Sequence, residues 1–187
     1  MNLLLKGIMV LAGIGLVLSV AAHLAALIGG SIPGGSAIWS LHIGIFVVWF
    51  PTVLVANRVT NGTNRKDSWR IVLSGCPHWM RVGLYGLFTY AIVNFIWFIA
   101  SRAMTGIGKS VSLAHEVRGF SGHWMVFYGA ACAVLYSVTQ VPELLQKKIC
   151  PNGHPVGVVD SFCATCGARV EREHWCLTTR LRGDGDT

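Results

Sequence analysis

Charged residues are scarce in this sequence. Asp, Glu, Lys and Arg make up 12% of its 187 residues, about half of the roughly 25% that soluble domains carry. None of these residue types occurs between Lys6 and Arg58. The sequence also lacks any grouping of serine, cysteine, histidine and carboxylate residues that would indicate a hydrolase. These absences exclude an ordinary soluble domain, and we expect a membrane protein without a catalytic site.

Long apolar segments without charge make up most of the chain. A helix needs about 20 apolar residues to cross a bilayer, and four segments are long enough. They are residues 8–28, 38–57, 82–101 and 119–142. The sequence therefore predicts an all-α membrane protein, with a four-helix transmembrane domain over residues 1–145. The competing interpretation of the first segment is a signal peptide, but its apolar run exceeds the ~7–15 residues usual for one.

Basic residues concentrate between the second and third apolar segments. Residues 58–81 contain five Lys or Arg and one Asp, together with Trp69 and Trp79. This mixture predicts a short helix on the membrane surface, with the tryptophans at headgroup depth. Since Lys and Arg favour the cytoplasmic side, we expect both termini to be cytoplasmic, in a bacterial inner (plasma) membrane. The connection 102–118 then lies outside, although it also contains three basic residues.

Three of the six cysteines lie close together near the C-terminus. The stretch Cys150-Pro-Asn-Gly-His154 is followed, eight residues later, by Cys163-Ala-Thr-Cys166. Zinc prefers four tetrahedral thiolate or imidazole ligands, and a segment of fewer than ~40 residues usually needs a metal or disulfides to fold. We therefore predict a structural zinc site. Two disulfides, or free thiols, are the alternative.

A small β-hairpin between the two stretches is expected to carry these ligands. The residues expected to line it are Val156, Val158 and Val159. Phe162 is expected to pack against the metal site. His174 and Cys176 follow downstream and can replace a ligand, but we assign them to a solvated segment.

The segment 149–170 resembles the short zinc ribbons that are appended to many bacterial proteins. Those ribbons have the form Cys-x-Asn-Gly-His followed by Phe-Cys-x-x-Cys-Gly, and both halves are present here. The resemblance implies a structural zinc ion. Its implied ligands are Cys150, His154, Cys163 and Cys166. We place the cytosolic ribbon in residues 146–176 and a flexible tail in residues 177–187.

Four histidines and one carboxylate are expected in the outer half of the bundle. They are His23, His42, His115, Glu116 and His123. Counting residues from the ends of the apolar segments places all five near the outer membrane surface. Two imidazoles at one depth can bind a haem iron, and a group that includes a carboxylate can bind a transition metal. A quinone or proton-relay role also fits, because ionisable groups within a membrane are usually functional. The alternative is that each histidine only packs, caps a helix or hydrogen-bonds between helices.

Two functions remain open from the sequence. In the first, the chain is a non-catalytic membrane protein, such as an accessory subunit, whose ribbon or helix faces contact a protein partner or another copy. In the second, it is a small redox or metal-handling protein that binds haem or another metal through the outer histidines. Nucleic-acid binding is disfavoured because residues 141–187 contain six basic and six acidic residues, and such binding depends on basic contacts.

Overall fold

The structure is a computed structural model that describes residues 2–61, 63, 65–105, 112–146, 148–157 and 160–170. Within these ranges the protein is mostly helical. The α-helices are α1 (Asn2–Leu27), α2 (Ser40–Thr60), α3 (Arg65–Val72), α4 (His78–Thr105) and α5 (Leu113–Gln140). Two 3-10 helices, η1 (Gly35–Trp39) and η2 (Pro142–Leu145), precede α2 and follow α5. Two short strands, β1 (Lys148–Ile149) and β2 (Pro155–Val156), complete the described elements.

The helices differ from the prediction in length and in how many of them are apolar enough to be candidate membrane spans. Three stretches of the described chain are long and apolar enough to cross a membrane: Leu3–Leu27, Gly35–Thr60 and His78–Met104. The predicted fourth segment forms α5, which is less apolar because it contains histidine, serine, glycine and tyrosine. A fifth α-helix, α3, lies where the surface helix was expected.

The predicted segment boundaries were too narrow for α4. This helix starts before Arg81 and continues past Arg102, whereas the charge-free segment stops at both residues. A charge marks where a chain leaves the hydrocarbon, but it does not interrupt the backbone hydrogen bonds of a helix. The hydrophobic pattern therefore located the helix but not its ends.

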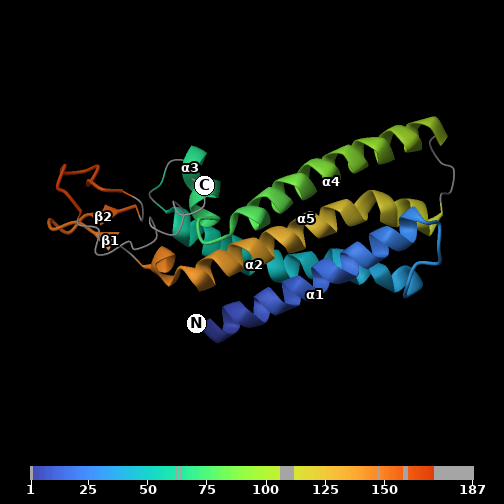
Figure 1. Cartoon of the computed structure of the whole chain (residues 1–187), viewed down its shortest axis with the longest axis horizontal. Coiled ribbons are helices and arrows are strands. Elements are labelled where there is room, and N and C mark those ends of the chain that lie inside the picture. Colours follow the sequence, from blue (N-terminus) through green and yellow to red (C-terminus); the bar gives the residue numbers. More distant parts are fainter. Residues whose placement is uncertain are drawn as a thin grey trace, which may run out of the picture.

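The α5 helix occupies the centre of the bundle, with α1, α2 and α4 packed around it (Figure 1). Small residues let these neighbours approach closely, as is common between membrane helices. Gly119 lies directly against Phe98 of α4, and Gly122 lies against Ala91. Trp124 is completely buried. The less apolar composition of α5 therefore reflects contacts with other helices.

Tyr128 of α5 fills the space between α1 and α2. Its ring lies against Gly15 of α1, and its hydroxyl lies beside Gly44 of α2. The hydroxyl donates a hydrogen bond to the carbonyl of Leu41, at 2.8 Å. A side chain at Gly15 would overlap the ring. Glycine at this position thus permits the three-helix contact.

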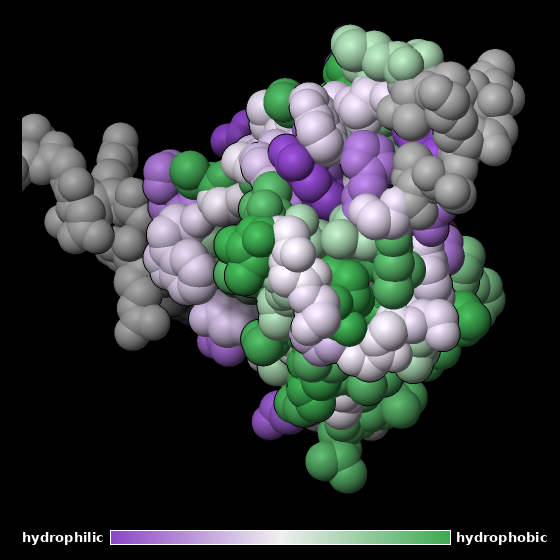
Figure 2. Space-filling view, turned by 90° about the vertical axis from the view of Figure 1, so that its right-hand side faces the viewer, coloured by the Kyte–Doolittle hydropathy of each residue, from purple (hydrophilic) through white to green (hydrophobic). Residues whose placement is uncertain are grey.

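The outward faces of α1, α2 and α4 are apolar. Large exposed side chains include Val10, Ile14, Val17, Ile43, Phe46, Phe50, Phe88, Ile92 and Ile96. Figure 2 looks onto the end of the bundle that holds the α4–α5 connection, and it shows apolar residues at the outer surface beside a group of hydrophilic ones. Soluble monomers rarely expose apolar patches of this extent. The surface therefore agrees with a membrane protein.

The start of α1, the α3 helix and the two strands lie at the same end of the bundle (Figure 1). The basic α2–α4 connection is thus at the end that carries the C-terminal module. Gly157 of this module lies beside the Thr63 side chain in the α2–α3 connection. The sequence motif with cysteine and histidine is therefore next to the most basic part of the bundle.

Candidate metal centre

Two tight turns with similar backbone hydrogen bonds contain the candidate cysteine and histidine ligands. In the first, the Cys150 N–H donates to the His154 carbonyl at 2.9 Å, and the Cys150 carbonyl accepts from the Gly153 N–H at 2.9 Å. In the second, the Cys163 N–H donates to the Ala168 carbonyl at 2.8 Å. Gly153 has a φ of 82°, a conformation that favours glycine.

The second turn also ends in a glycine with positive φ, Gly167 at 69°. Its N–H donates to the Cys163 carbonyl at 2.8 Å. The strands β1 and β2 flank the first turn and pair antiparallel, with Lys148 opposite Val156. A bridge between Phe162 and Arg169 closes the second. Local backbone hydrogen bonds therefore set the position of each ligand without a large core.

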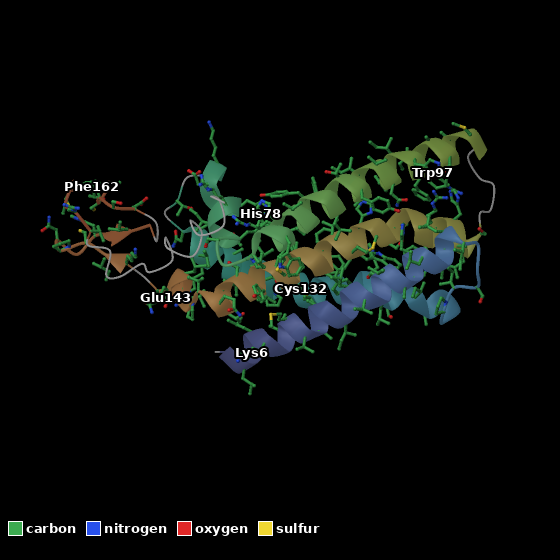
Figure 3. The ribbon with its side chains drawn as sticks, in the orientation of Figure 1. Lys6, His78, Trp97, Cys132, Glu143 and Phe162 are labelled. Atoms are coloured by element: carbon green, nitrogen blue, oxygen red, sulfur yellow. The ribbon has the colours of Figure 1, made fainter. Side chains whose placement is uncertain are left out.

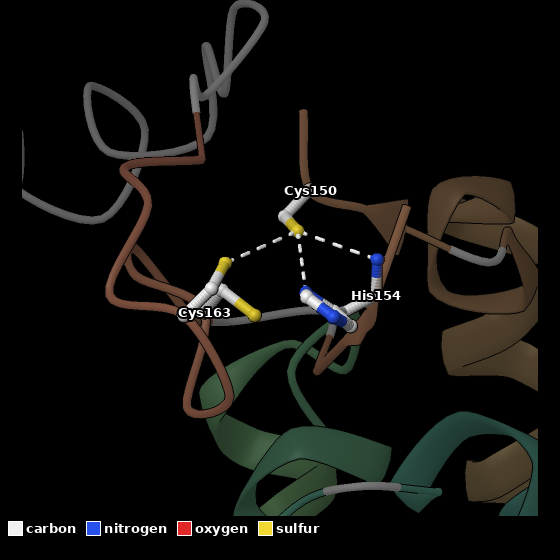
Figure 4. Close-up of side chains that lie close together, drawn as sticks. Cys150, His154 and Cys163 are labelled. Atoms are coloured by element: carbon white, nitrogen blue, oxygen red, sulfur yellow. Dashed lines mark hydrogen bonds between the residues drawn. The ribbon is translucent and has the colours of Figure 1, made fainter. Parts of the chain in front are cut away.

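The two turns bring all four predicted ligands together, and Figure 4 labels three of them, Cys150, His154 and Cys163. The ligand atoms of Cys150, His154, Cys163 and Cys166 lie within 4.8 Å of one another. The Cys150 Sγ is 3.6 Å from the His154 Nδ1 and 3.7 Å from the Cys166 Sγ. A tetrahedral zinc, with Zn–S of about 2.3 Å and Zn–N of about 2.0 Å, needs separations of about 3.5 Å for the S–N pair and about 3.8 Å for the S–S pair. The group can therefore hold a metal ion.

Hydrogen bonds at the turns favour the thiolate form that metals require. The Ala168 backbone N–H and the Asn152 side chain lower the pKa of Cys166 to about 7. The Asn152 Nδ2 donates to the Cys166 Sγ at 3.4 Å. Burial acts to raise the pKa of Cys163, but backbone N–H groups in its turn lower it overall. Burial raises the pKa of Cys150.

The disulfide alternative does not describe this structure. Cys150, Cys163 and Cys166 are all free, and the 3.7 Å between two of the sulfurs far exceeds a disulfide bond of about 2.05 Å. His174 and Cys176, the proposed replacement ligands, lie outside the described residues. So do Val158, Val159 and the predicted flexible tail at 177–187.

The small core of the module differs from the prediction in one position. Val156 packs against the buried Cys150, Cys163 and Val170, as expected. Phe162 does not cover the metal site, because its side chain is 60% exposed. Figure 3 shows it at the outer edge of the module, away from the helices. Phe162 pairs through its backbone with Arg169.

The outer histidines occupy separate environments at the end of the bundle where α1 ends and α5 begins. His23 is buried in α1, with its Nδ1 2.7 Å from the Ser121 Oγ and its Nε2 2.5 Å from the Tyr90 hydroxyl. His42 of α2 accepts a hydrogen bond from the Trp124 indole N–H at 3.0 Å. These two histidines thus link helices by hydrogen bonds.

The other outer residues have different neighbours. The His115 Nε2 lies 3.2 Å from the Ser101 Oγ. His123 packs edge-on against Phe95, and its buried Nδ1 has no hydrogen-bond partner among the described residues. Glu116 lies in the first turn of α5.

The structure does not gather these outer residues into one metal-binding group. Within the part of the chain that the structure describes, the cluster at Cys150–Cys166 is the one set of three or more such ligands close enough to hold a metal. The phenyl ring of Phe120 is a neighbour of both His42 and His123. Haem or metal binding by these histidines stays a prediction.

Replacing His23 with leucine should weaken the bundle by on the order of 1 kcal/mol. The change removes both hydrogen bonds of the imidazole and leaves the Tyr90 hydroxyl without that partner. Unfolding by sodium dodecyl sulfate in mixed micelles measures the effect. The control is His78→Ala, because His78 is exposed at the start of α4. Equal stability of both variants would show that the His23 contacts contribute nothing.

Three polar partners were missed from the sequence. Tyr90, Ser121 and Asn152 complete the surroundings of His23 and Cys166. Contacts between α1, α4 and α5 join residues far apart in the chain and leave no pattern in the local sequence. Nothing in the sequence therefore indicated that Tyr90 and Ser121 would contact His23. Asn152 lies inside the first turn and could have been found from its place beside Gly153.

No family model, curated protein or solved structure matches the chain.

Proposed function

We propose that the chain is an integral membrane protein whose zinc ribbon is a structural and interaction module, as in an accessory subunit of a membrane complex. The observation that carries this proposal is the convergence of four ligand atoms within 4.8 Å on a short segment next to a helical bundle. Four protein ligands fill a tetrahedral zinc site. A site without an open position is structural, so the ribbon stabilises a surface and does not catalyse a reaction.

The membrane part of the proposal includes α5 as a fourth span. Its 28 residues give a length of about 42 Å, more than the roughly 30 Å of hydrocarbon in a bilayer. No charged residue occurs between Arg118 and Glu143. An internal span contacts helices rather than lipid, and it therefore needs less apolar character than α1, α2 or α4.

Four spans would bring both ends of the chain to the same side of the membrane. The basic residues of the α2–α4 connection support a cytoplasmic location for that side, by the preference of Lys and Arg for the cytoplasmic face. A reducing compartment also keeps cysteines as thiols. We therefore propose a bacterial inner membrane location, with the zinc ribbon in the cytoplasm.

The ribbon exposes two large apolar side chains to solvent. Ile149 and Phe162 are about three fifths exposed, one on each of the two turns. A module this small cannot bury every large side chain, but a metal holds its exposed side chains in fixed positions. Exposed, rigid apolar side chains are typical anchors of protein interfaces. We propose that this surface contacts the protein partner or a second copy of the chain.

Serine at both Ile149 and Phe162 should separate binding from metal content. We expect the doubly substituted protein to keep its zinc. The fraction of the protein that is bound to a partner or to a second copy should fall at least tenfold, as measured by mass photometry of detergent-purified protein. Ala164→Ser, at an exposed position of the second turn, is the control and should change neither. Unchanged assembly mass in the double variant would contradict a role for this surface.

A further inference from the structure

A cavity of about 670 Å³ lies between α4 and its neighbours, and its lining extends from Trp69 of α3 to the middle of α4 and α5. Its walls come from α2, α3, α4 and α5. The lining is aromatic or aliphatic apart from His123. The lining residues used below are Trp69, Leu84, Tyr85, Phe88, Ile92 and Ile96. Several of them are also exposed on the outer surface of α4, so the cavity is open toward the surrounding lipid.

The depth of the cavity matches one leaflet of a bilayer. Its α4 wall extends from Leu84 to Ile96, which is about 18 Å along a helix. Half of a hydrocarbon core of roughly 30 Å is about 15 Å. The cavity therefore starts near the headgroups on the α3 side and reaches past the middle of the membrane. A chain-shaped apolar molecule from that leaflet fits this direction and depth.

A cationic residue, Arg81, lies about one helical turn before Leu84, where the α4 wall of the cavity begins, and we call this end of the cavity its mouth. Arg81 precedes Tyr85, Phe88 and Ile92 by four, seven and eleven residues, so all four occupy the same face of α4. The Nε of Arg81 is buried and has no hydrogen-bond partner within the described chain. A buried donor without a partner is costly, and a phosphate oxygen would satisfy it with a strong charge-assisted bond.

The surroundings of the mouth also favour an anion at headgroup depth. Trp69 belongs to the cavity lining and Trp79 is exposed nearby at the start of α4, and tryptophan is enriched at membrane interfaces. The connection 58–81 has five basic residues and one acidic residue. Basic clusters beside membrane helices attract anionic lipids.

We propose that this cavity binds one acyl chain of an anionic phospholipid, whose phosphate is held by Arg81. The apolar walls hold the chain, and the guanidinium selects the headgroup. This inference depends on the proposed membrane insertion and is independent of the zinc ribbon. A zwitterionic lipid would gain the chain contacts but a weaker net interaction at Arg81. A quinone would instead place its ring near His123.

Photo-crosslinking in lipid nanodiscs tests the site directly. The probes are phosphatidylglycerol and phosphatidylcholine with the same diazirine-labelled acyl chain. We expect phosphatidylglycerol to label residues 84–96 at least fivefold more than phosphatidylcholine. Arg81→Gln should remove that preference and Arg81→Lys should keep most of it. Lys6→Gln, a basic residue on the other side of the bundle from His78 (Figure 3), should have no effect.

A second pair of variants tests the cavity itself. Ile92→Trp fills the cavity and should reduce labelling several-fold, whereas Val93→Trp alters an exposed neighbour outside the lining and should not. Each preparation should still contain one zinc per chain. This control distinguishes a loss of lipid binding at the cavity from a loss of the folded zinc ribbon. Equal labelling by both lipids, an unaffected Arg81→Gln protein, or one quinone per chain in a solvent extract would overturn the proposal.

Discussion

Replacing Cys163 with serine should release the metal and unfold the C-terminal module. A neutral hydroxyl is a poor zinc ligand, so the site would keep only three ligands. Zinc contributes on the order of 10–16 kcal/mol to the folding of small zinc modules. The core of this module consists of Cys150, Cys163 and Val170, with Val156 packed against it, which is too little to replace that contribution. We expect bound zinc to fall from about one per chain to less than about a tenth.

Metal analysis and limited proteolysis measure this outcome. Cleavage in the segment after Gln140 should become much faster in the Cys163→Ser protein, while the helices stay intact. Cys132→Ser is the matched control, because Cys132 is a free cysteine in α5 outside the metal group. The faster cleavage should occur in inside-out membrane vesicles and not in sealed right-side-out ones. Cleavage from the outer side would contradict the proposed orientation.

Replacing Gly15 with valine should cause a large loss of stability in the bundle. The new side chain would overlap the Tyr128 ring and force it away from α1. Overpacking of this kind costs about 1–3 kcal/mol, and loss of the Tyr128 hydrogen bond to Leu41 adds about 1 kcal/mol. We expect a total of roughly 2–4 kcal/mol, measured by unfolding in dodecyl sulfate mixed micelles.

Gly13→Val provides a matched control for this change. It lies two residues away in the same helix, and a Cβ at that position meets no atom within 4 Å. The intrinsic helix preferences of glycine and valine cancel in the comparison. We expect Gly13→Val to stay within about 0.5 kcal/mol of the unchanged protein, as is usual for substitutions away from packed sites. Equal losses at both positions would show that Tyr128 does not connect α1 with α5.

The sequence predicted the helical regions because their signal is local. Charge-free apolar runs marked α1, α2 and α4, and the basic, tryptophan-containing connection indicated α3. The central position of α5 was not predictable. Its polar and small residues meet Phe98, Ala91 and Gly15 on other helices, and a hydrophobic pattern does not say which helices pack together.

The two groups of candidate site residues also differ in whether their contacts are local in the sequence or depend on how the helices pack. The ligands Cys150, His154, Cys163 and Cys166 lie within one short segment, and two glycine turns suffice to bring them together. The outer histidines come from α1, α2 and α5, so their neighbours depend on helix packing. His23 meets Tyr90 and Ser121, while Trp124 binds His42. Equal membrane depth alone did not imply contact between histidines.

The outward position of Phe162 changes how the ribbon is understood. The sequence assigned this phenylalanine to the metal site, where it would have shielded the zinc. The structure has it exposed, so a metal bound at the cluster would stabilise a module that presents an apolar residue to its surroundings. The exposed position of Phe162 therefore bears more directly on the proposed interaction role than the candidate metal cluster does.

Zinc K-edge X-ray absorption of the purified, reduced full-length protein, combined with its metal content, tests the central claim most directly. We predict one zinc per chain, bound by three sulfurs at about 2.3 Å and one nitrogen at about 2.0 Å. An absorption spectrum of the same sample would reveal any haem through its Soret band. A protein that binds no zinc, or whose Cys150, Cys163 and Cys166 form disulfides when freshly isolated from cells, would contradict the structural zinc ribbon.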